Sequence, residues 1–201
     1  MPIFSKLTKR KTDLPAKVLS IGWFVKDDII RLMDSGKNIE VVAYDPCEEV
    51  AREYRSISWP KLTVECQAVE AEKGTAHLFI DTDNRGATST QREGHGKTIE
   101  VPATTLEAIV ARYGPFDAVY INCEGCEIPV IQATPIEILR RCSVIFVQFH
   151  KFIGLVSDED IEGCLRKLKE DFDYKMVDSR YPNYKFVRKG IREVVRFKFI
   201  R

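Results

Sequence analysis

The sequence predicts an α/β fold with a doubly wound, mostly parallel sheet, antiparallel edge strands near the C-terminus and one inserted hairpin. The first observation is a repeated alternation of short apolar runs with amphipathic helical patterns, which is typical of strand–helix–strand units. The second is a series of closely spaced strand patterns at the end of the chain, with no helical pattern between them. The third is a stretch of alternating apolar and polar residues in the middle of the chain, which is typical of half-exposed strands.

The strands of the sheet are expected wherever a short apolar run is bounded by turn residues. The parallel strands cover residues 17–22, 40–45, 62–69, 116–122 and 143–149, and the terminal strands cover 174–177, 184–187 and 194–200. The inserted hairpin is expected at residues 75–81 and 98–101. Its polar loop, residues 83–97, is long enough to predict a functional lid or a disordered segment.

Helical patterns follow most of these strands. They cover residues 27–35, 46–57, 104–113, 127–141 and 157–171. Thr104 or Thr105 is expected to cap the third helix, and Ser157 with Asp160 is expected to form a capping box at the last. Residues 1–16 are polar and basic, so we interpret them as a lead-in arm before a single domain that spans residues 17–201.

Composition argues against several classes of protein. With 31 basic and 30 acidic residues, the net charge of +1 gives no electrostatic case for nucleic acid as the main partner. No apolar run approaches the roughly 18 residues of a membrane span, and no apolar secretory signal follows Met1. We therefore expect a cytoplasmic protein whose six cysteines are free thiols.

Ligands of open α/β sheets bind outside the carboxyl ends of the strands, where the strand order reverses. Gly22 ends the first predicted strand and Asp45 ends the second, so both belong to this edge. Asp45 could accept hydrogen bonds from the hydroxyls of a nucleoside ribose or could merely cap the following helix, and its position favours neither. A single glycine after the first strand is a weak sign of a nucleotide site, and a tight turn is the favoured explanation of Gly22.

The segment from Tyr120 to Glu127 (YINCEGCE) is the most informative, because two acids flank a glycine where a buried strand ends. Glu127 would lie in the first turn of the next helix, where the helix dipole favours an acid. Glu124 has no such structural explanation. Cys123 and Cys126 have the spacing of redox and zinc-binding pairs, but no second pair completes a zinc site, so we favour incidental thiols and predict no metal.

His150 follows the fifth predicted strand and belongs to the same edge of the sheet. It could act as a general base or contact a substrate, although a structural histidine with satisfied hydrogen bonds is somewhat favoured. His77, in the hairpin, and His95, in the polar loop, are expected at the surface.

Three stretches together resemble the FkbM family of S-adenosylmethionine-dependent methyltransferases. Residues 117–127 (DAVYINCEGCE) are similar to the family's apolar strand that runs into Lys-Ile-Asp-x-Glu-Gly-x-Glu. Residues 98–106 (TIEVPATTL) resemble its step from a strand into a Thr-Leu helix start, and residues 42–46 (VAYDP) resemble the acid-Pro end of its second strand. Their order and spacing match the family over residues 17–155.

The resemblance implies a class I methyltransferase fold, which is Rossmann-like, with S-adenosylmethionine as the cofactor. It implies that the ribose of the cofactor lies on Asp45, that its methionine end lies near Gly22, and that the acceptor pocket lies between the loops after the fourth and fifth strands. The residues expected at the cofactor site are Gly22, Trp23, Lys26, Asp45, Val69 and Asn122, and those expected to position or deprotonate the acceptor are Glu124 and His150.

The sequence departs from the family pattern at several of these positions. The family has an acid where Ser20 stands and a second glycine where Lys26 stands. It has lysine, aspartate and glutamate where Tyr120, Asn122 and Gln148 stand. Lys26 could block the methionine pocket or could pair with the carboxylate of the cofactor. Each charged contact that is lost is worth about 1.5–3 kcal/mol.

The leading prediction is an O-methyltransferase that acts on the hydroxyl of a small molecule or a sugar, because members of the family commonly modify such acceptors. One alternative is a methyltransferase fold that has lost catalysis and serves as a binding or interaction module. Another is a different nucleoside-binding α/β enzyme, such as one that uses nucleotide sugars. A homodimer is compatible with the apolar edge strands near the C-terminus.

Overall fold

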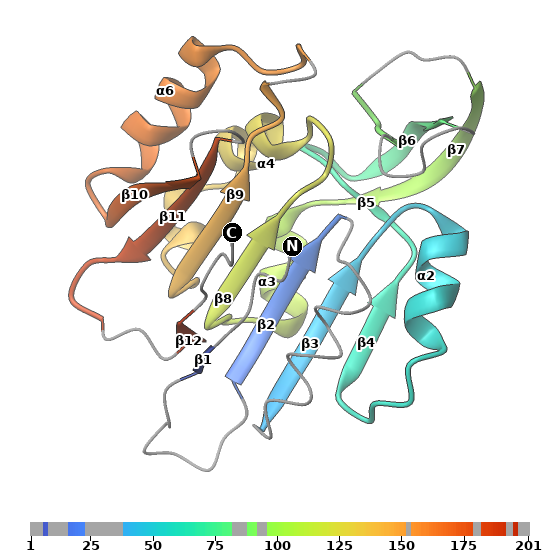
Figure 1. Cartoon of the computed structure of the whole chain (residues 1–201), viewed down its shortest axis with the longest axis horizontal. Helices are drawn as coiled ribbons and strands as arrows, with labels where there is room; N and C mark the ends of the chain where they lie inside the picture. Colours follow the sequence, from blue (N-terminus) through green and yellow to red (C-terminus); the bar gives the residue numbers. More distant parts are fainter. Residues whose placement is uncertain are drawn as a thin grey trace.

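A seven-stranded sheet forms the centre of the computed structural model, with the strand order β10-β11-β9-β8-β2-β3-β4 (Figure 1). The structure describes residues 6–7, 16–22, 38–81, 88–91, 96–151, 154–178, 182–191 and 195–196. The strands of this sheet are β2 (Ala16–Ile21), β3 (Ile39–Tyr44), β4 (Leu62–Glu65), β8 (Ala118–Ile121), β9 (Val144–Gln148), β10 (Phe172–Asp178) and β11 (Asn183–Arg188).

Strands β2, β3, β4, β8 and β9 pair in parallel, whereas β11 runs antiparallel to both of its neighbours, β9 and β10. The predicted doubly wound, mostly parallel sheet is therefore confirmed. Its antiparallel character is confined to β11, which lies one strand in from the edge. Strand order reverses between β2 and β8, because the chain extends the sheet in one direction through β3 and β4 and in the other through β9.

The central strands are mostly apolar because both of their faces are buried. In β2, Leu19 and Ile21 belong to the larger hydrophobic cluster on one face of the sheet, and Val18 belongs to the cluster on the other face. The edge strand β10 differs, because its residues 173–176 are all exposed.

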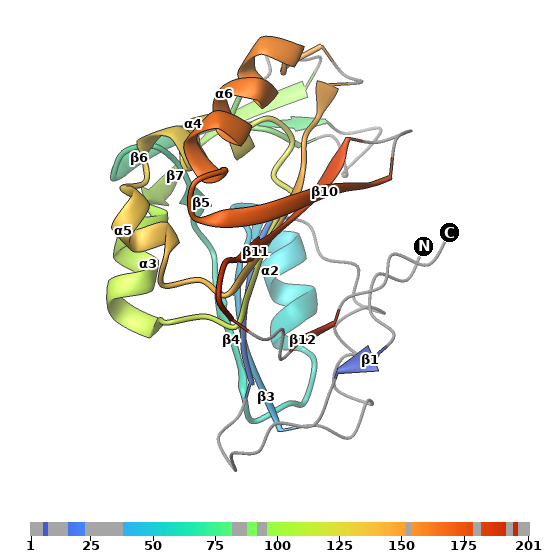
Figure 2. The same cartoon turned by 90° about the vertical axis from the view of Figure 1, so that its left-hand side faces the viewer.

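Helices cover both faces of this sheet (Figure 2). Helices α3 (Leu106–Tyr113), α4 (Glu127–Ala133), α5 (Ile136–Leu139) and α6 (Asp158–Leu168) contribute to the larger cluster, and α2 (Glu48–Arg55) covers the opposite face. The predicted caps are confirmed: the Thr105 hydroxyl accepts from the N–H of Ala108 at 3.2 Å, and Ser157 and Asp160 form the capping box. The helix predicted at residues 27–35 lies outside the described residues.

The third predicted strand, residues 62–69, is wrong as a continuous element. Strand β4 ends at Glu65, and β5 (Ala68–Val69) belongs to a separate three-stranded sheet of order β5-β7-β6. This small sheet contains the predicted hairpin, whose strands β6 (Gly74–Asp81) and β7 (Gly96–Thr104) are longer than expected. Strand β5 leaves the main sheet because it pairs in parallel with the end of β7, where the N–H of Glu70 also donates to the carbonyl of Thr104 at 2.8 Å.

The N-terminal arm contributes a strand of its own. Strand β1 (Lys6–Leu7) pairs antiparallel with β12 (Val195–Arg196), so the last predicted strand joins the arm instead of the main sheet. No helix in the described parts of the chain combines the length and the apolar character needed to cross a bilayer.

Candidate functional site

A cavity of about 540 Å³, which includes the solvent at its mouth, opens at the carboxyl ends of β2, β3, β5 and β8. Its lining contains Gly22, Asp45, Val69 and Asn122, which are the four predicted cofactor residues that the structure describes. Glu124 lines the same cavity. Trp23 and Lys26, the other two predicted cofactor residues, lie outside the described residues.

Gly22 lies where the loops after β2 and β8 meet. Its φ angle is +82°, and a Cβ atom built on it would lie 1.9 Å from the carbonyl oxygen of Asn122. The backbone pairs here in both directions, because Gly22 N–H donates to Tyr44 on β3 and Asn122 N–H donates to Ile21 on β2, each at 2.9 Å. A side chain at position 22 would therefore collide with the loop that carries Glu124, and the glycine is required by this close approach as well as by a tight turn.

Asp45 lies both at the start of α2 and at the cavity, which are the positions that the two alternatives drawn from the sequence require. Its Oδ1 accepts from the N–H of Cys47, the N-cap residue of α2, at 2.9 Å, and the side chain also lines the cavity. The residue is only 5% exposed, and burial raises the pKa of its carboxyl to about 6 even though the hydrogen bond from Cys47 lowers it. A further hydrogen-bond donor that entered the cavity would stabilise the ionised carboxylate.

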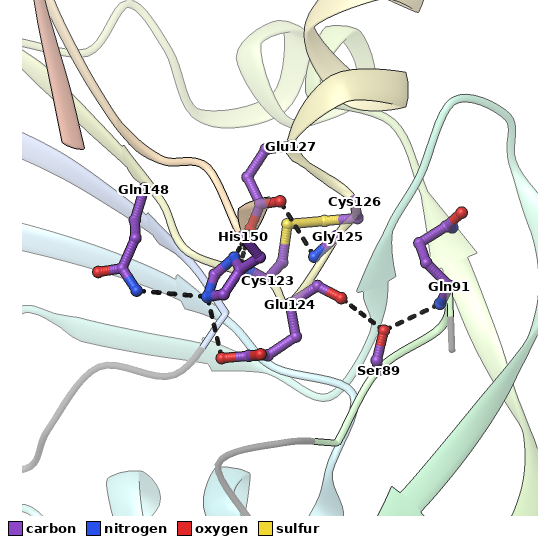
Figure 3. A network of polar contacts seen from close by, with 9 residues as sticks. All are labelled: Ser89, Gln91, Cys123, Glu124, Gly125, Cys126, Glu127, Gln148 and His150. Carbon is purple, nitrogen blue, oxygen red and sulfur yellow. Dashed lines mark hydrogen bonds and ion pairs between the residues drawn. A yellow bond between two sulfur atoms is a disulfide. The ribbon is translucent and has the colours of Figure 1, made fainter. Parts of the chain in front are cut away.

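The loop from β8 to α4 is shaped by Glu127. This glutamate is fully buried, and its two carboxylate oxygens accept from the N–H groups of Cys123 at 2.9 Å and Gly125 at 3.0 Å (Figure 3). Between them, Glu124 has a φ angle of +53° and Gly125 one of +113°. The carboxylate of Glu127 thus replaces backbone partners that a turn of this shape cannot provide.

His150 lies between the two glutamates (Figure 3). Its Nδ1 is 2.7 Å from Oε1 of Glu127 and its Nε2 is 3.0 Å from Oε1 of Glu124. The amide of Gln148 lies 3.3 Å from Nε2. Burial alone would lower the pKa of His150, but the hydrogen bonds and charges of Glu124 and Glu127 outweigh it and raise the pKa to about 9.

His150 is therefore an imidazolium at neutral pH, with both ring nitrogens directed at carboxylates. The side chain is also completely buried. A cation in this position has no lone pair with which to deprotonate an acceptor, so the geometry favours a role in positioning Glu124. Of the two predicted acceptor residues, only Glu124 lines the cavity.

Glu127 is a residue whose importance the sequence analysis missed. Its place in the first turn of a helix offered a sufficient local explanation, and its partner His150 lies 23 residues further along the chain. The signal that could have found it was the spacing of two acids around Gly125, combined with a histidine at the end of the neighbouring strand.

The tip of the inserted hairpin covers this loop. Ser89 exchanges backbone hydrogen bonds with Phe79 of β6, and its hydroxyl donates to the carbonyl of Glu124 at 2.5 Å. Gln91 lies beside Ser89, since its N–H donates to the Ser89 hydroxyl at 3.0 Å, and a Cβ atom on Gly125 would be 3.1 Å from the Cβ of Gln91. The predicted polar loop thus reaches the cavity through Thr88, Ser89 and Thr90, whereas residues 83–87 and 92–95 of that loop lie outside the described residues.

Cys123 and Cys126 form a disulfide. The prediction of free thiols is therefore wrong for this pair, because the turn around Glu124 and Gly125 brings their Cα atoms to 5.5 Å. Cys47, Cys66, Cys142 and Cys164 are free, as predicted. His77 is exposed as expected, and His95 lies outside the described residues.

The model of the FkbM methyltransferase domain matches residues 24–176. The chain belongs to the FkbM methyltransferase family. The resemblance found in the sequence is thereby confirmed, and so is the methyltransferase class to which it assigned the chain.

Solved structures of the plantazolicin methyltransferase BpumL are similar to this chain. The complex of BpumL with SAH is 11% identical to this chain, with a TM-score of 0.48. The match covers 87% of this chain and 76% of the BpumL chain. The complex with SAH and a triazolic desmethylPZN analogue is 12% identical, with a TM-score of 0.43, and covers 87% and 77% of the two chains. Among curated proteins, none matches this chain.

The residues that line the cavity fit an S-adenosylmethionine cofactor in two respects. The buried carboxylate of Asp45 faces a space in which ribose hydroxyls could donate to it. Apolar side chains, among them Ile21, Val69 and Leu78, line the same space and suit the flat base of a nucleoside.

Proposed function

We propose that this chain transfers a methyl group from S-adenosylmethionine to a hydroxyl of a small molecule or a sugar. The observation that carries the proposal is the convergence of Gly22, Asp45, Val69, Asn122 and Glu124 on one cavity at the point where strand order reverses. Strand ends at such a point are the usual ligand site of an open α/β sheet.

In this proposal Asp45 holds the ribose hydroxyls, and Gly22 with Asn122 borders the methionine end. The cofactor supplies an activated methyl group when it is bound. Glu124 orients the hydroxyl of the acceptor and accepts its proton. His150 and Glu127 keep the Glu124 carboxylate in place, because the imidazolium bridges the two carboxylates at 3.0 and 2.7 Å.

Calorimetric titration with S-adenosylmethionine and S-adenosylhomocysteine tests the cofactor part of the proposal. We expect saturable binding to the native chain and an affinity at least tenfold lower for Asp45→Asn, because a neutral amide is a weaker acceptor for two hydroxyls than a carboxylate. The exposed Glu159 on α6 offers a control, and Glu159→Gln should bind as the native chain does. An absence of heat with the native chain at millimolar cofactor would reject the proposal.

Transfer of a radiolabelled methyl group to a panel of hydroxylated small molecules and sugars tests the acceptor part. For an acceptor that is methylated, Glu124→Gln should lower kcat by about a hundredfold or more, which is the usual contribution of a positioned general base. Cofactor affinity should change little in this variant, because Asp45 is untouched. Equal rates in Glu124→Gln and Glu159→Gln would remove Glu124 from the mechanism.

A binding module without catalysis is the second candidate. It is favoured by Ser20, whose buried hydroxyl has no hydrogen-bond partner among the described residues at a position where the family has an acid. Asn122 and Gln148 also replace family acids by amides. Any turnover by the native chain excludes this candidate. Cofactor binding that appears only after Asn122→Asp would support it.

A homodimer is the proposed assembly. Strand β10 is an edge of the main sheet and exposes Tyr174 by 46% and Met176 by 50%. Exposed apolar side chains on an unpaired strand edge favour pairing with a second copy. Light scattering coupled to size-exclusion chromatography decides the question, and Met176→Lys should give a monomer if β10 forms the contact.

A further inference from the structure

The disulfide between Cys123 and Cys126 lies in the wall of the proposed active site. Both cysteines line the same cavity as Asp45 and Glu124. They also flank Glu124 and Gly125, so that the disulfide closes a small ring around the proposed acceptor-binding residue (Figure 3). A change in the redox state of this pair would thus take place within the site itself.

The ring holds Glu124 in an uncommon backbone conformation. A φ angle of +53° costs a residue with a side chain about 1–2 kcal/mol relative to the right-handed region, so it persists only where the surroundings enforce it. The disulfide is one such restraint, and the hydrogen bonds of Glu127 to the N–H groups of Cys123 and Gly125 are another. Opening the disulfide removes one restraint on the backbone that directs Glu124 toward His150.

The other cysteines are poor partners for thiol–disulfide chemistry. Burial raises the pKa of Cys142 and Cys164 to about 12 and that of Cys66 to about 11, and it also raises the pKa of Cys47. The thiolate is the nucleophile in disulfide exchange, so these four residues stay largely unreactive at neutral pH. Cys123 is partly exposed at the cavity, whereas Cys126 is only 2% exposed.

We propose that Cys123 and Cys126 form a reversible redox site that fixes Glu124 when oxidised and releases it when reduced. Oxidation proceeds by exchange with a low-molecular-weight disulfide. The Cys123 thiolate attacks one sulfur and releases one thiol, and Cys126 then displaces the second thiol to form the intramolecular disulfide. Reduction by a small thiol runs in reverse. The consequence for methyl transfer, but not the redox site itself, rests on the function proposed above.

Mass spectrometry of the native chain in glutathione redox buffers tests the site without any variant. Cleavage after Arg112 and Arg140 yields a peptide that contains Cys123 and Cys126 and no other cysteine. We expect this peptide to pass reversibly between a disulfide and a doubly alkylated form as the buffer becomes reducing, while the other four cysteines remain thiols. A peptide that stays in one form from excess reduced to excess oxidised glutathione would overturn the proposal.

The link to Glu124 is tested by NMR titration of His150. The chain has three histidines, and His77 serves as an exposed control. Reduction should lower the pKa of His150, because a released Glu124 stabilises the imidazolium less, and should leave His77 unchanged. The double variant Cys123→Ser/Cys126→Ser should give the reduced value in every buffer. An identical pKa of His150 in both redox states would refute the link.

Methyl transfer provides the functional readout. Reduction of the native chain should lower kcat by roughly tenfold, since a small displacement of a positioning group can cost up to about a hundredfold. Cofactor affinity should be unchanged. If neither redox state transfers a methyl group, the proposed function fails, while mass spectrometry and the titration of His150 still decide the redox site. Equal kcat in two states that differ by mass spectrometry would refute the functional consequence.

Discussion

At the scale of single residues, Asp45 is a carboxylate that is buried. Its burial lowers the stability of the folded chain, but the same carboxylate is available to a ligand in the cavity. Its pKa of about 6 exceeds the ordinary value of about 3.9, so the folded chain binds more protons than the unfolded chain between these values. Stability therefore falls as the pH rises through this window. Asp45→Asn should remove the penalty and raise the free energy of unfolding at pH 7 by about 2 kcal/mol, as measured by urea denaturation.

The amide of that variant can still accept from the N–H of Cys47, so this contact at the start of α2 is retained. At pH 4 the native chain and Asp45→Asn should be nearly equal in stability, because the carboxyl is then protonated in the folded chain. Asp173→Asn, on the exposed edge strand, is the matched control and should change stability by no more than about 0.5 kcal/mol. A variant less stable than the native chain at pH 7 would contradict this account of Asp45.

The charged form of His150 stabilises the fold, whereas the charged form of Asp45 destabilises it, although both raised pKa values make stability fall as the pH rises. Its folded pKa of about 9 lies above the ordinary value of about 6.5, so its contribution to stability is complete below about 6.5 and is lost as the pH rises through 9. His150→Gln should cost about 3 kcal/mol at pH 6, because the buried carboxylate of Glu127 and the partly exposed one of Glu124 lose their cation, and clearly less at pH 9. Denaturant unfolding at both pH values measures the difference, with His77→Gln as an exposed control. Equal costs at the two pH values would show that the imidazolium is not what stabilises this loop.

The place of three predicted residues at the cavity could be inferred from their position along the chain. Gly22, Asp45 and Asn122 stand at the carboxyl ends of strands, and the topology of a parallel sheet brings such positions together. Glu127 and the bond between Cys123 and Cys126 were missed for the same physical reason. Both depend on the shape of one turn with consecutive positive φ angles, and no periodicity in the sequence encodes that shape.

At the scale of elements, the contact between the β2 and β8 loops can be tested through two glycines with nearly equal backbone angles. Gly22 has a φ of +82° and Gly190 one of +76°, but only Gly22 has neighbours that a Cβ atom would strike. Gly190→Ala should cost about 1 kcal/mol for the left-handed conformation. Gly22→Ala should cost about 3 kcal/mol or more, because the loop after β8 must also move. If denaturant unfolding gave similar losses of stability for the two variants, the close approach of the β2 and β8 loops would not contribute to the cost of Gly22→Ala.

Elements with strong local signals were predicted closely, and those set by pairing were not. Helix α6 carries its own capping box, and β2 and β3 are apolar on both faces. Strand β5 has no local feature that separates it from β4, and it leaves the main sheet because β7 offers it a partner 35 residues further along the chain, in the register of Ala68 with Ala103. A pattern of neighbouring residues carries no information about a pairing partner at that distance along the chain, so the separation of β5 from β4 could not be predicted.

At the scale of the whole molecule, the cavity is an assembly of loops from both halves of the sheet. Asp45 follows β3, Glu124 follows β8, and Ser89 lies in the loop between β6 and β7 of the small sheet. No single element of the fold therefore carries all of the residues that line the cavity. A ligand that bridges Asp45 and the β8 loop would connect the two halves of the sheet and should stabilise the entire fold.

Thermal unfolding with ligand tests this directly. At a concentration one hundred times its Kd, S-adenosylhomocysteine should add about 2.7 kcal/mol and raise the Tm of the native chain by about 5–10 °C. Asp45→Asn should melt higher than the native chain without ligand and gain less from the same ligand concentration, so the difference between the two Tm values should narrow on addition. This narrowing separates a binding carboxylate from a purely structural one. If Asp45 had only a structural role, the ligand would raise the Tm of the native chain and of Asp45→Asn by the same amount.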